Sequence, residues 1–278
     1  MGSEGITIER KAALAIVTFC RVERMNAFDA AMFTALEKAA RTLATDRQIR
    51  AVIVTGAGED AFSAGFDVNP DNPMVEEMAQ AIERRDTGPI EGAIGVLRAA
   101  VDRLVALPVP VIAAVNGKAF GGGAELAVRC DLRVMDPAAE ICFSEVRLGL
   151  MPDWGGGAAL THLLGSAAAA DLVLTARRVR AEEALQLGLI NRISQPGKAL
   201  EAAMEMAGSI ARNGPLAVRQ ALKVIRAGRN LSLQATLELE RQTAIDLIAS
   251  GECLHGITAF LTGQAPAFPD PSLEDAST

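Results

Sequence analysis

The chain has 278 residues, of which 50% are hydrophobic and 22% are charged, a balance typical of a soluble globular protein with one large core. A formal net charge of −7 argues against a broad nucleic-acid-binding face, and the densest basic run, "RRVR" at 177–180, is short. No apolar run is long enough to span a bilayer and no signal-peptide core is visible, so we expect a cytoplasmic protein without membrane contact.

Cysteine and histidine are sparse, and their spacing argues against several kinds of site. No two cysteines form a C-x-x-C pair, and the two histidines lie far apart in the sequence. This pattern disfavours a metal centre and most nucleophile systems that rely on histidine. The residues concerned are Cys20, Cys130, Cys142, Cys253, His162 and His255.

The first half of the chain alternates strand and helix patterns. A helix is predicted over 29–44, with Asp29 as its N-cap. Short apolar runs predict strands at 14–19, 51–56, 109–117, 131–136 and 140–145. From about residue 155 the patterns become mostly helical. The alternation predicts an α/β core, for which we take residues 1–200, followed by a helical C-terminal region, 201–278.

Residues 69–92 interrupt this alternation with a stretch rich in proline and acidic residues. Its middle, 74–85, has the pattern of an amphipathic helix whose inward residues would be Val75, Met78, Ala79 and Ile82. A helix of this kind after a strand and loop is compatible with a flap over a pocket, and equally with a solvent-exposed loop.

Two glycine-containing loops follow buried strands. The first, 56–67, contains G-x-G-x-x-A, but no helix opens after it, so a dinucleotide site is disfavoured. Gly65 would free the backbone to point the amide of Phe66 into a cavity. In the second loop, 116–126, glycines lead into a helix start that carries positive partial charge. Each loop alone is an ordinary turn; together they could direct two N–H groups at one oxygen, as an oxyanion hole does.

Two acids lie close to these loops. Glu125 follows the glycines at the helix start, and Glu145 follows 20 residues later, at the end of a predicted strand. The interval is long enough to double back, so both carboxylates could face one cavity and move protons during addition of water to a C=C bond. Taken singly, Glu125 could instead be a helix-dipole partner, and Glu145 a solvent-exposed acid.

Several long segments, in order, resemble the crotonase family, also called the enoyl-CoA hydratase/isomerase family. They are "RMNAFDAAMFTALEKA", "AFSAGFD", "PVIAAVNGKAFGGGAELAVRCDLRV", "FSEVRLGLMPDWGGG" and "EEALQLGLINRI". The resemblance runs from about residue 6 to 265. It implies a spiral of ββα units with a helical C-terminal region that assembles trimers or hexamers.

The resemblance also implies roles for individual residues. Phe66 and Gly122 stand where the family donates two N–H groups to the thioester oxygen of an acyl-CoA. Glu125 would position and deprotonate the water, and Glu145 would exchange a proton with the α-carbon. Further substrate contacts are expected from Arg24, Ala64, Asp67, Gly121, Asp153 and Trp154.

The sequence departs from its relatives in ways that bear on substrate choice. The chain reads "VNP" after Asp67, where many relatives carry a lysine, so that the CoA phosphates are expected either to be bound by Arg21, Arg24 or Lys118 or to be bound more weakly. Asp153 replaces a glycine and would either add a third carboxylate to the site or cap the next helix. The segment 69–92 is longer than usual. The bulky side chains of Phe66, Phe143 and Trp154 are expected near the acyl pocket.

These features predict an enzyme that reversibly adds water to a 2-enoyl-CoA to give a 3-hydroxyacyl-CoA. Two glutamates favour hydration over the alternative of double-bond isomerisation on acyl-CoA. A non-catalytic, crotonase-like binding subunit is a further alternative. No metal or redox cofactor is implied, and coenzyme A enters only as part of the substrate.

Overall fold

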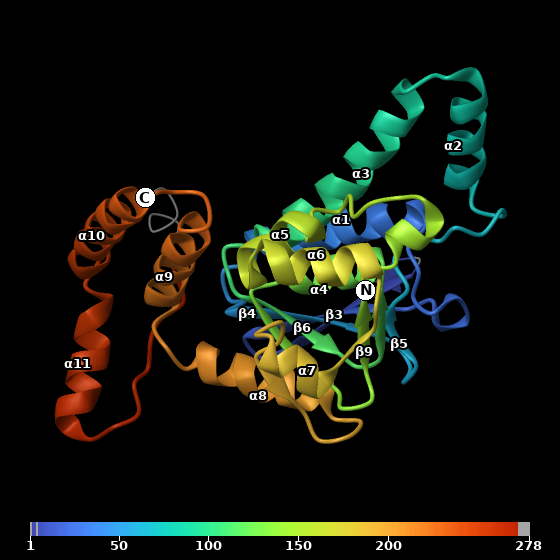
Figure 1. Cartoon of the computed structure of the whole chain (residues 1–278). Helices are drawn as coiled ribbons and strands as arrows, with labels where there is room; N and C mark the ends of the chain where they lie inside the picture. Colours follow the sequence, from blue (N-terminus) through green and yellow to red (C-terminus); the bar gives the residue numbers. More distant parts are fainter. Residues whose placement is uncertain (1, 4, 272–278) are drawn as a thin grey trace.

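The computed structural model describes residues 2, 3 and 5–271, and its first sheet carries most of the strands (Figure 1). From β3 to β11 this sheet is parallel, while β1, β2 and β3 pair antiparallel. In spatial order its strands are β1 (Gly2–Ser3), β2 (Ile6–Lys11), β3 (Leu14–Phe19), β4 (Ala51–Gly56), β6 (Val111–Val115), β8 (Leu132–Met135) and β11 (Arg192–Ile193).

A second, smaller sheet is made of short strands, three of which, β5, β7 and β9, directly follow a strand of the first. Its spatial order is β10 (Val179–Arg180), β9 (Glu140–Cys142), β7 (Lys118–Phe120) and β5 (Ala61–Ser63). The chain passes from β4 to β5, from β6 to β7 and from β8 to β9. Because β5, β7 and β9 are parallel neighbours, their carboxyl ends lie side by side.

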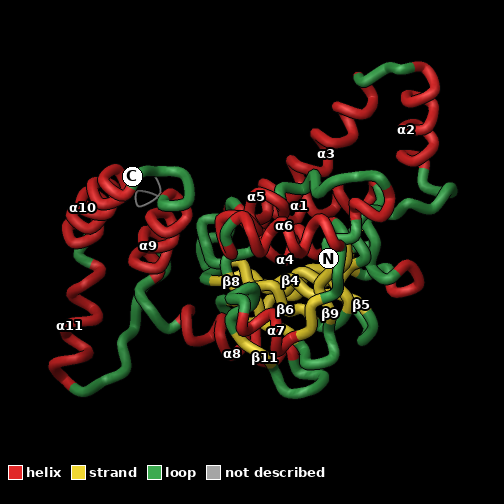
Figure 2. Tube along the Cα trace, viewed as in Figure 1, coloured by secondary structure: helices red, strands yellow, loops and turns green. Residues whose placement is uncertain are grey.

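A helical segment follows each of these strand pairs. After β5 come α2 (Pro73–Arg84) and α3 (Gly88–Val105), and after β7 comes α4 (Gly122–Arg129). After β9 come the 3-10 helix η2 (Glu145–Leu148), α5 (Gly156–Leu164) and α6 (Ser166–Thr175). This succession of strand, strand and helix confirms the predicted spiral of ββα units (Figure 2). The remaining helices of the body are η1 (Val22–Arg24), α1 (Ala30–Thr45), α7 (Ala181–Gln186) and α8 (Ala199–Ala211).

The helix α8 belongs to the body and corrects the predicted domain boundary. It covers β4, β6 and β8, where Ala203, Met206 and Ala207 pack against the apolar face of the first sheet. A division between residues 200 and 201 would cut this helix and expose that face. The structural break falls after α8, so the separate C-terminal region is shorter than expected, and residues 272–278 of the predicted region lie outside the described residues.

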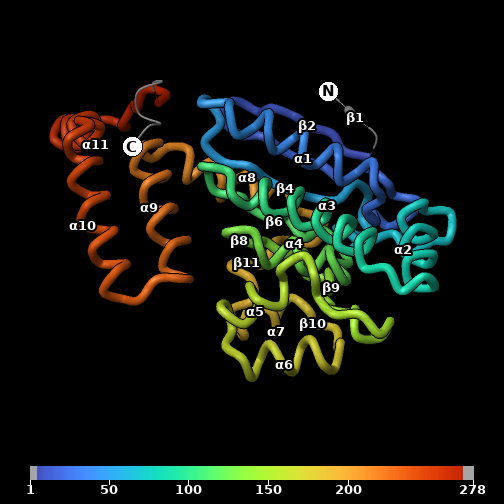
Figure 3. Tube along the Cα trace, turned by 90° about the horizontal axis from the view of Figure 1, so that it is seen from above, coloured from blue at the N-terminus to red at the C-terminus, as the bar shows by residue number. Residues whose placement is uncertain are grey.

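Three helices form an arm to one side of the body: α9 (Pro215–Ala227), α10 (Leu233–Ala249) and α11 (Glu252–Thr262) (Figures 1 and 3). Arg226 of α9 reaches the body, where its Nη2 lies 2.5 Å from Oδ2 of Asp131. The carboxylate of Glu252 accepts hydrogen bonds from the amides of Leu216 and Ala217, which caps the start of α9. The arm is therefore fixed at its base and closed upon itself.

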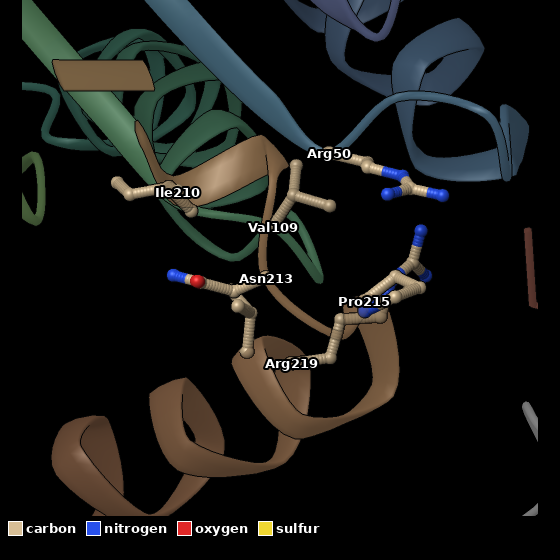
Figure 4. Close-up of a pocket in the computed structure, with 7 residues that line it drawn as sticks. Arg50, Val109, Ile210, Asn213, Pro215 and Arg219 are labelled. Carbon is tan, nitrogen blue, oxygen red and sulfur yellow. The ribbon is translucent and has the colours of Figure 1, made fainter. Parts of the chain in front are cut away.

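Arg50 and Arg219 face each other at the joint between body and arm, in a small pocket also lined by Val109, Asn213 and Pro215 (Figure 4). Arg50 donates hydrogen bonds to the carbonyl oxygens of Ala211 and Phe268, which ties the end of α8 and the returning C-terminal segment to the start of β4. None of the predicted site residues lines this pocket.

The outer helices of the arm expose large apolar side chains. Phe260 is 85% exposed and Leu233 is 77% exposed. Others on α10 and α11 are Leu237, Ile245, Ile248, Leu254, Ile257 and Leu261. Within residues 5–271, no single helix has the length and apolarity to cross a membrane; α10 and α11 reach that length only as a pair bent by 71°.

Most predicted elements are confirmed, with two local corrections. The strands at 14–19 and 51–56 form as predicted, and Asp29 caps α1 by accepting the amide of Met32. Glu145, however, does not end a strand: β9 stops at Cys142 and Glu145 begins η2. In α2, the buried residue is Ala81, whereas Ile82 is 67% exposed and Ala79 also faces solvent.

Two helical glycines give opposite predictions for stability. A Cβ on Gly123 of α4 would collide with the carbonyl oxygen of Ser63, whereas a Cβ on Gly92 of α3 would meet nothing within 4 Å. Gly123→Ala should therefore lower the free energy of unfolding by about 2 kcal/mol or more, while Gly92→Ala should raise it by about 0.5–1 kcal/mol. Urea titrations at one protein concentration would measure both; equal effects would contradict the packing described for α4.

Candidate active site

The two glycine loops meet because the strands before them are parallel neighbours. Gly65 follows β5 and Gly122 follows β7, and the backbones approach so closely that a Cβ on Gly65 would lie 2.6 Å from the amide nitrogen of Gly122. Gly65 also has φ +87°, in the region that side chains disfavour. The turn and the close approach both require glycine at this position.

The amides of Phe66 and Gly122 are unpaired at this meeting point. The neighbouring amides are used: Ala64 donates to the carbonyl oxygen of Met25, and Gly121 donates to that of Cys142. Among the described residues, neither the Phe66 nor the Gly122 amide has a hydrogen-bond acceptor. Gly122 is also the first residue of α4, whose aligned peptide dipoles give this end positive partial charge. The pair can therefore bind one oxygen that gains negative charge.

Trp154 supports this loop from behind. A Cβ on Gly122 would lie 2.5 Å from the indole ring, which packs edge-on against Phe28 and Phe33. Trp154 and Phe143 are each 1% exposed and belong to the main core. The expectation that these two side chains add bulk to the acyl pocket is therefore wrong: Trp154 fixes the position of Gly122 instead.

Glu125 is fully buried in the first turn of α4 and is held by a second helix. Its carboxylate accepts the amide of Gly156, the first residue of α5, at 2.7 Å, and the amide of Asp153 at 3.1 Å. Gly156 packs directly on the Glu125 side chain, where a Cβ would collide. From the sequence, Glu125 could be a partner for the dipole of its own helix, α4. In the structure its carboxylate instead accepts a hydrogen bond from the first residue of α5.

Glu145 approaches the same place from the end of the β9 segment. Its side chain is 9% exposed, and neither carboxyl oxygen has a hydrogen-bond partner among the described residues. A Cβ on Gly121 would lie 3.8 Å from its Oε1, so the carboxyl borders the loop that carries the Gly122 amide. A buried carboxyl without partners is costly unless a ligand or water satisfies it, which is typical of a functional group.

The pKa values of both carboxyls are raised, chiefly by burial. Burial, together with the nearby charges of Glu145 and Asp153, raises the pKa of Glu125 to about 8, against the opposing effect of the Gly156 amide. Burial likewise raises the pKa of Glu145, with a further contribution from Asp153. Such a pair can retain one proton near neutral pH, so that one member can donate a proton while the other accepts one.

Asp153 does not cap the following helix, which was one of the two alternatives for it. The N-cap of α5 is Gly155, and the first amide of this helix donates to Glu125 rather than to Asp153. The Asp153 carboxyl lies close enough to influence both glutamates, so it does add a third acid beside the site. Burial raises its own pKa, and the charge of Arg98 on α3 opposes that effect.

Some of the residues predicted to contact the CoA part of a substrate are already paired within the protein, whereas others are exposed. Asp67 is buried and pairs with Arg21 at 3.0 Å, and Arg21 also donates to the carbonyl oxygen of Ala27, so both side chains hold the loop together. Arg24 is freer, since its side chain is 39% exposed and its ion pair with Asp71 is 3.8 Å long. Lys118 is exposed at the start of β7. Arg24 and Lys118 remain available for anionic groups.

In residues 5–271, no group of three or more His, Cys, Asp or Glu side chains is arranged to hold a metal ion.

Comparisons with known proteins agree with this geometry. Residues 9–271 match the family described as Enoyl-CoA hydratase/isomerase. The short-chain-enoyl-CoA hydratase of Clostridium acetobutylicum is 33% identical over 263 residues, which cover 94% of this chain and 96% of that protein. The 2,3-dehydroadipyl-CoA hydratase of Escherichia coli is 34% identical, with 95% and 98% covered.

A solved structure supports the same conclusion. The crystal structure of an enoyl-CoA hydratase from Bacillus anthracis superposes with a TM-score of 0.88 at 32% identity, covering 96% of this chain and all of that one. Sequence and fold agree over nearly the whole length, and the chain belongs to the enoyl-CoA hydratase/isomerase family.

Proposed function

We propose that this protein is an enoyl-CoA hydratase that reversibly adds water across the 2,3 double bond of a 2-enoyl-CoA. The observation that carries the proposal is the unpaired amides of Phe66 and Gly122 beside the buried carboxyls of Glu125 and Glu145. Relatives named as hydratases, at 33–34% identity over nearly the full chain, support the same reaction.

The two amides would receive the thioester oxygen of the substrate. Attack of water on C3 moves electron density through the double bond onto this oxygen, which becomes an enolate. Fixed N–H groups stabilise the enolate more than the neutral carbonyl, and the rigid backing of Trp154 keeps them in place. Because they are already oriented, little reorganisation is needed as the charge develops.

The two glutamates would move the protons. Glu125 takes a proton from the attacking water, whose oxygen bonds to C3, and Glu145 gives a proton to C2 as the enolate collapses. The reverse sequence removes water from a 3-hydroxyacyl-CoA. The reaction is redox-neutral, so it calls for no redox cofactor, and coenzyme A enters as part of the substrate. Arg24, whose side chain is 39% exposed, would contact its anionic groups.

The alternatives are less well supported by this site. A double-bond isomerase needs one group to carry a proton between two carbons, whereas this site holds two buried glutamates of raised pKa. A non-catalytic binding subunit would not need unpaired amides beside buried acids, which cost stability.

We also propose that the protein forms trimers or hexamers through its arm. The support is the set of exposed apolar side chains on α10 and α11, which a single chain leaves in water. The joint at Arg50 and Arg226 fixes the arm in one direction, which favours a defined contact between copies.

Substitution of the glutamates tests the reaction. Glu145→Gln and Glu125→Gln should each lower kcat for hydration of crotonyl-CoA by about 10²–10⁴-fold, because each removes a proton-transfer group. Binding of the saturated butyryl-CoA, measured by calorimetry, should persist. The exposed Glu182 provides a matched control, Glu182→Gln, that should keep normal rates. Near-normal hydration by both site variants would refute the assignment.

The pH dependence tests the shared proton. Because the pKa of Glu125 is raised to about 8, the pair should lose its last proton above that pH. The kcat/KM for hydration reports the free enzyme and should therefore fall above about pH 8, approaching tenfold per pH unit. Initial rates between pH 6 and 10, corrected for spontaneous thioester hydrolysis, would measure it. A kcat/KM that stays constant to pH 10 would show that no proton is shared.

Light scattering after size-exclusion chromatography tests the assembly. Phe260→Asp places a charge on the most exposed apolar side chain of the arm and should shift the protein towards monomers. Ile82→Asp makes the same change at an exposed position on α2, outside the arm, and should leave the oligomer intact. A wild-type protein that is monomeric at micromolar concentration would exclude the proposal.

A further inference from the structure

The direction of the unpaired Phe66 amide is fixed by a backbone bridge to the segment before α1. The amide of Phe28 donates to the carbonyl oxygen of Gly65 at 2.7 Å, and the amide of Asp67 donates to the carbonyl oxygen of Phe28 at 2.9 Å, which pairs Phe28 with Phe66 in parallel. The peptide that joins Gly65 to Phe66 is trans, so its C=O and N–H groups point in opposite directions. Because the C=O group points at Phe28, the Phe66 N–H group must point away from it.

Arg21 links the two segments of this bridge through its side chain. Its Nη1 donates to the carbonyl oxygen of Ala27 at 2.6 Å, and its Nη2 lies 3.3 Å from Oδ2 of Asp29. These two residues flank the bridge on one segment. The same Nη2 lies 3.0 Å from Oδ2 of Asp67, which directly follows Phe66 on the other segment. The planar guanidinium can hold all three acceptors at once, and the side chains of Arg21 and Asp67 are largely shielded from water.

The turn between Arg21 and the bridge is strained, and it binds the same loop. Met25 and Asn26 have φ of +50° and +55°, which residues other than glycine rarely adopt. The carbonyl oxygen of Met25 accepts the amide of Ala64, and that of Asn26 accepts the hydroxyl of Ser63. The buried side chain of Asn26 donates to the carbonyl oxygen of Ala61 at 2.8 Å. Strain of this kind persists only where many contacts fix the backbone, and here they fix the loop that ends in Phe66.

We propose that Arg21 is a positioning residue for the hydration reaction: by linking Asp67 to the segment before α1, it holds the Phe66 amide in the direction that receives the thioester oxygen. The inference rests on the proposed hydratase function. Arg21 acts through Asp67 and Phe66 and does not touch the reacting atoms. Its Nη atoms are occupied by partners within the protein, so we assign it no contact with the CoA phosphates.

Kinetics of Arg21→Ala test this role. Loss of the link lets the Phe66 peptide move, which weakens binding of the enolate more than binding of the neutral thioester. We expect kcat for hydration of crotonyl-CoA to fall about 10–100-fold, while the Kd for the saturated butyryl-CoA, measured by calorimetry, changes by less than about threefold. The stoichiometry of the same titration counts the folded sites. Arg21→Lys keeps the charge but not the fork of donors, and should lose about three- to tenfold in kcat.

A truncated substrate separates positioning from phosphate binding. Crotonyl-pantetheine carries the same thioester but no phosphate, so a positioning role predicts an equal fold-loss of kcat/KM for this substrate and for crotonyl-CoA in Arg21→Ala. The contact with Asp67 can be tested in the same way. Asp67→Asn should lower kcat to a similar degree, and the double variant should lose little more than either single variant, because both changes break one link.

Arg10 supplies a matched control, because it also contacts a carboxylate, that of Asp46, and a backbone carbonyl, but belongs to β2 outside the site. Arg10→Ala should keep a normal kcat. Three results would overturn the proposal: a normal kcat per folded site in Arg21→Ala, a loss confined to the CoA substrate, or losses that multiply in the double variant with Asp67→Asn. Failure of the hydratase function would be distinct, since the wild-type protein would then hydrate no 2-enoyl-CoA.

Discussion

The close approach of Gly65 to Gly122 is the contact on which the site depends. The two peptide backbones lie so near that a side chain at Gly65 would collide with the amide nitrogen of Gly122. The parallel pairing of β5 with β7 imposes this approach, and the indole of Trp154 closes the space behind Gly122. The amides of Phe66 and Gly122 are left unpaired beside each other's loop. A binding place for a developing oxyanion is thus a consequence of strand pairing.

The same arrangement explains why acids can be tolerated there. Glu125 is buried, yet its carboxylate receives two amides, one of them from the start of α5. Glu145 receives none and is the less satisfied of the two. Burial and repulsion keep protons on the acids at a pH at which exposed glutamates have lost them. The pair therefore costs stability and can exchange protons, and the charge of Asp153 further raises the pKa of both acids.

The body and the arm differ in how far they bury their apolar side chains. The body buries its apolar faces between two sheets and their helices, with α8 covering the far side of the first sheet. The arm is anchored through Arg226 and Asp131 but leaves apolar side chains of α10 and α11 in water. The residues proposed for the site thus all lie in the body, and the exposed apolar face of the arm supports the proposed contact with other copies of the chain.

The sequence by itself determined the order of the elements and the identity of the site's amides and acids. Apolar runs that end in glycine predicted β4, Asp29 predicted the start of α1, and the paired loops and acids predicted Phe66, the loop 116–126, Glu125 and Glu145, because these signals are local in the chain. The choice of Gly122 within that loop came from the resemblance to the family. The resemblance to a family supplied their roles and the ββα spiral. Only the tertiary structure decided that Trp154 lies in the core behind Gly122, that Glu125 caps α5, that α8 belongs to the body and that Asp67 is occupied by Arg21. Each of these depends on contacts between residues far apart in sequence, which side-chain periodicity and spacing do not encode.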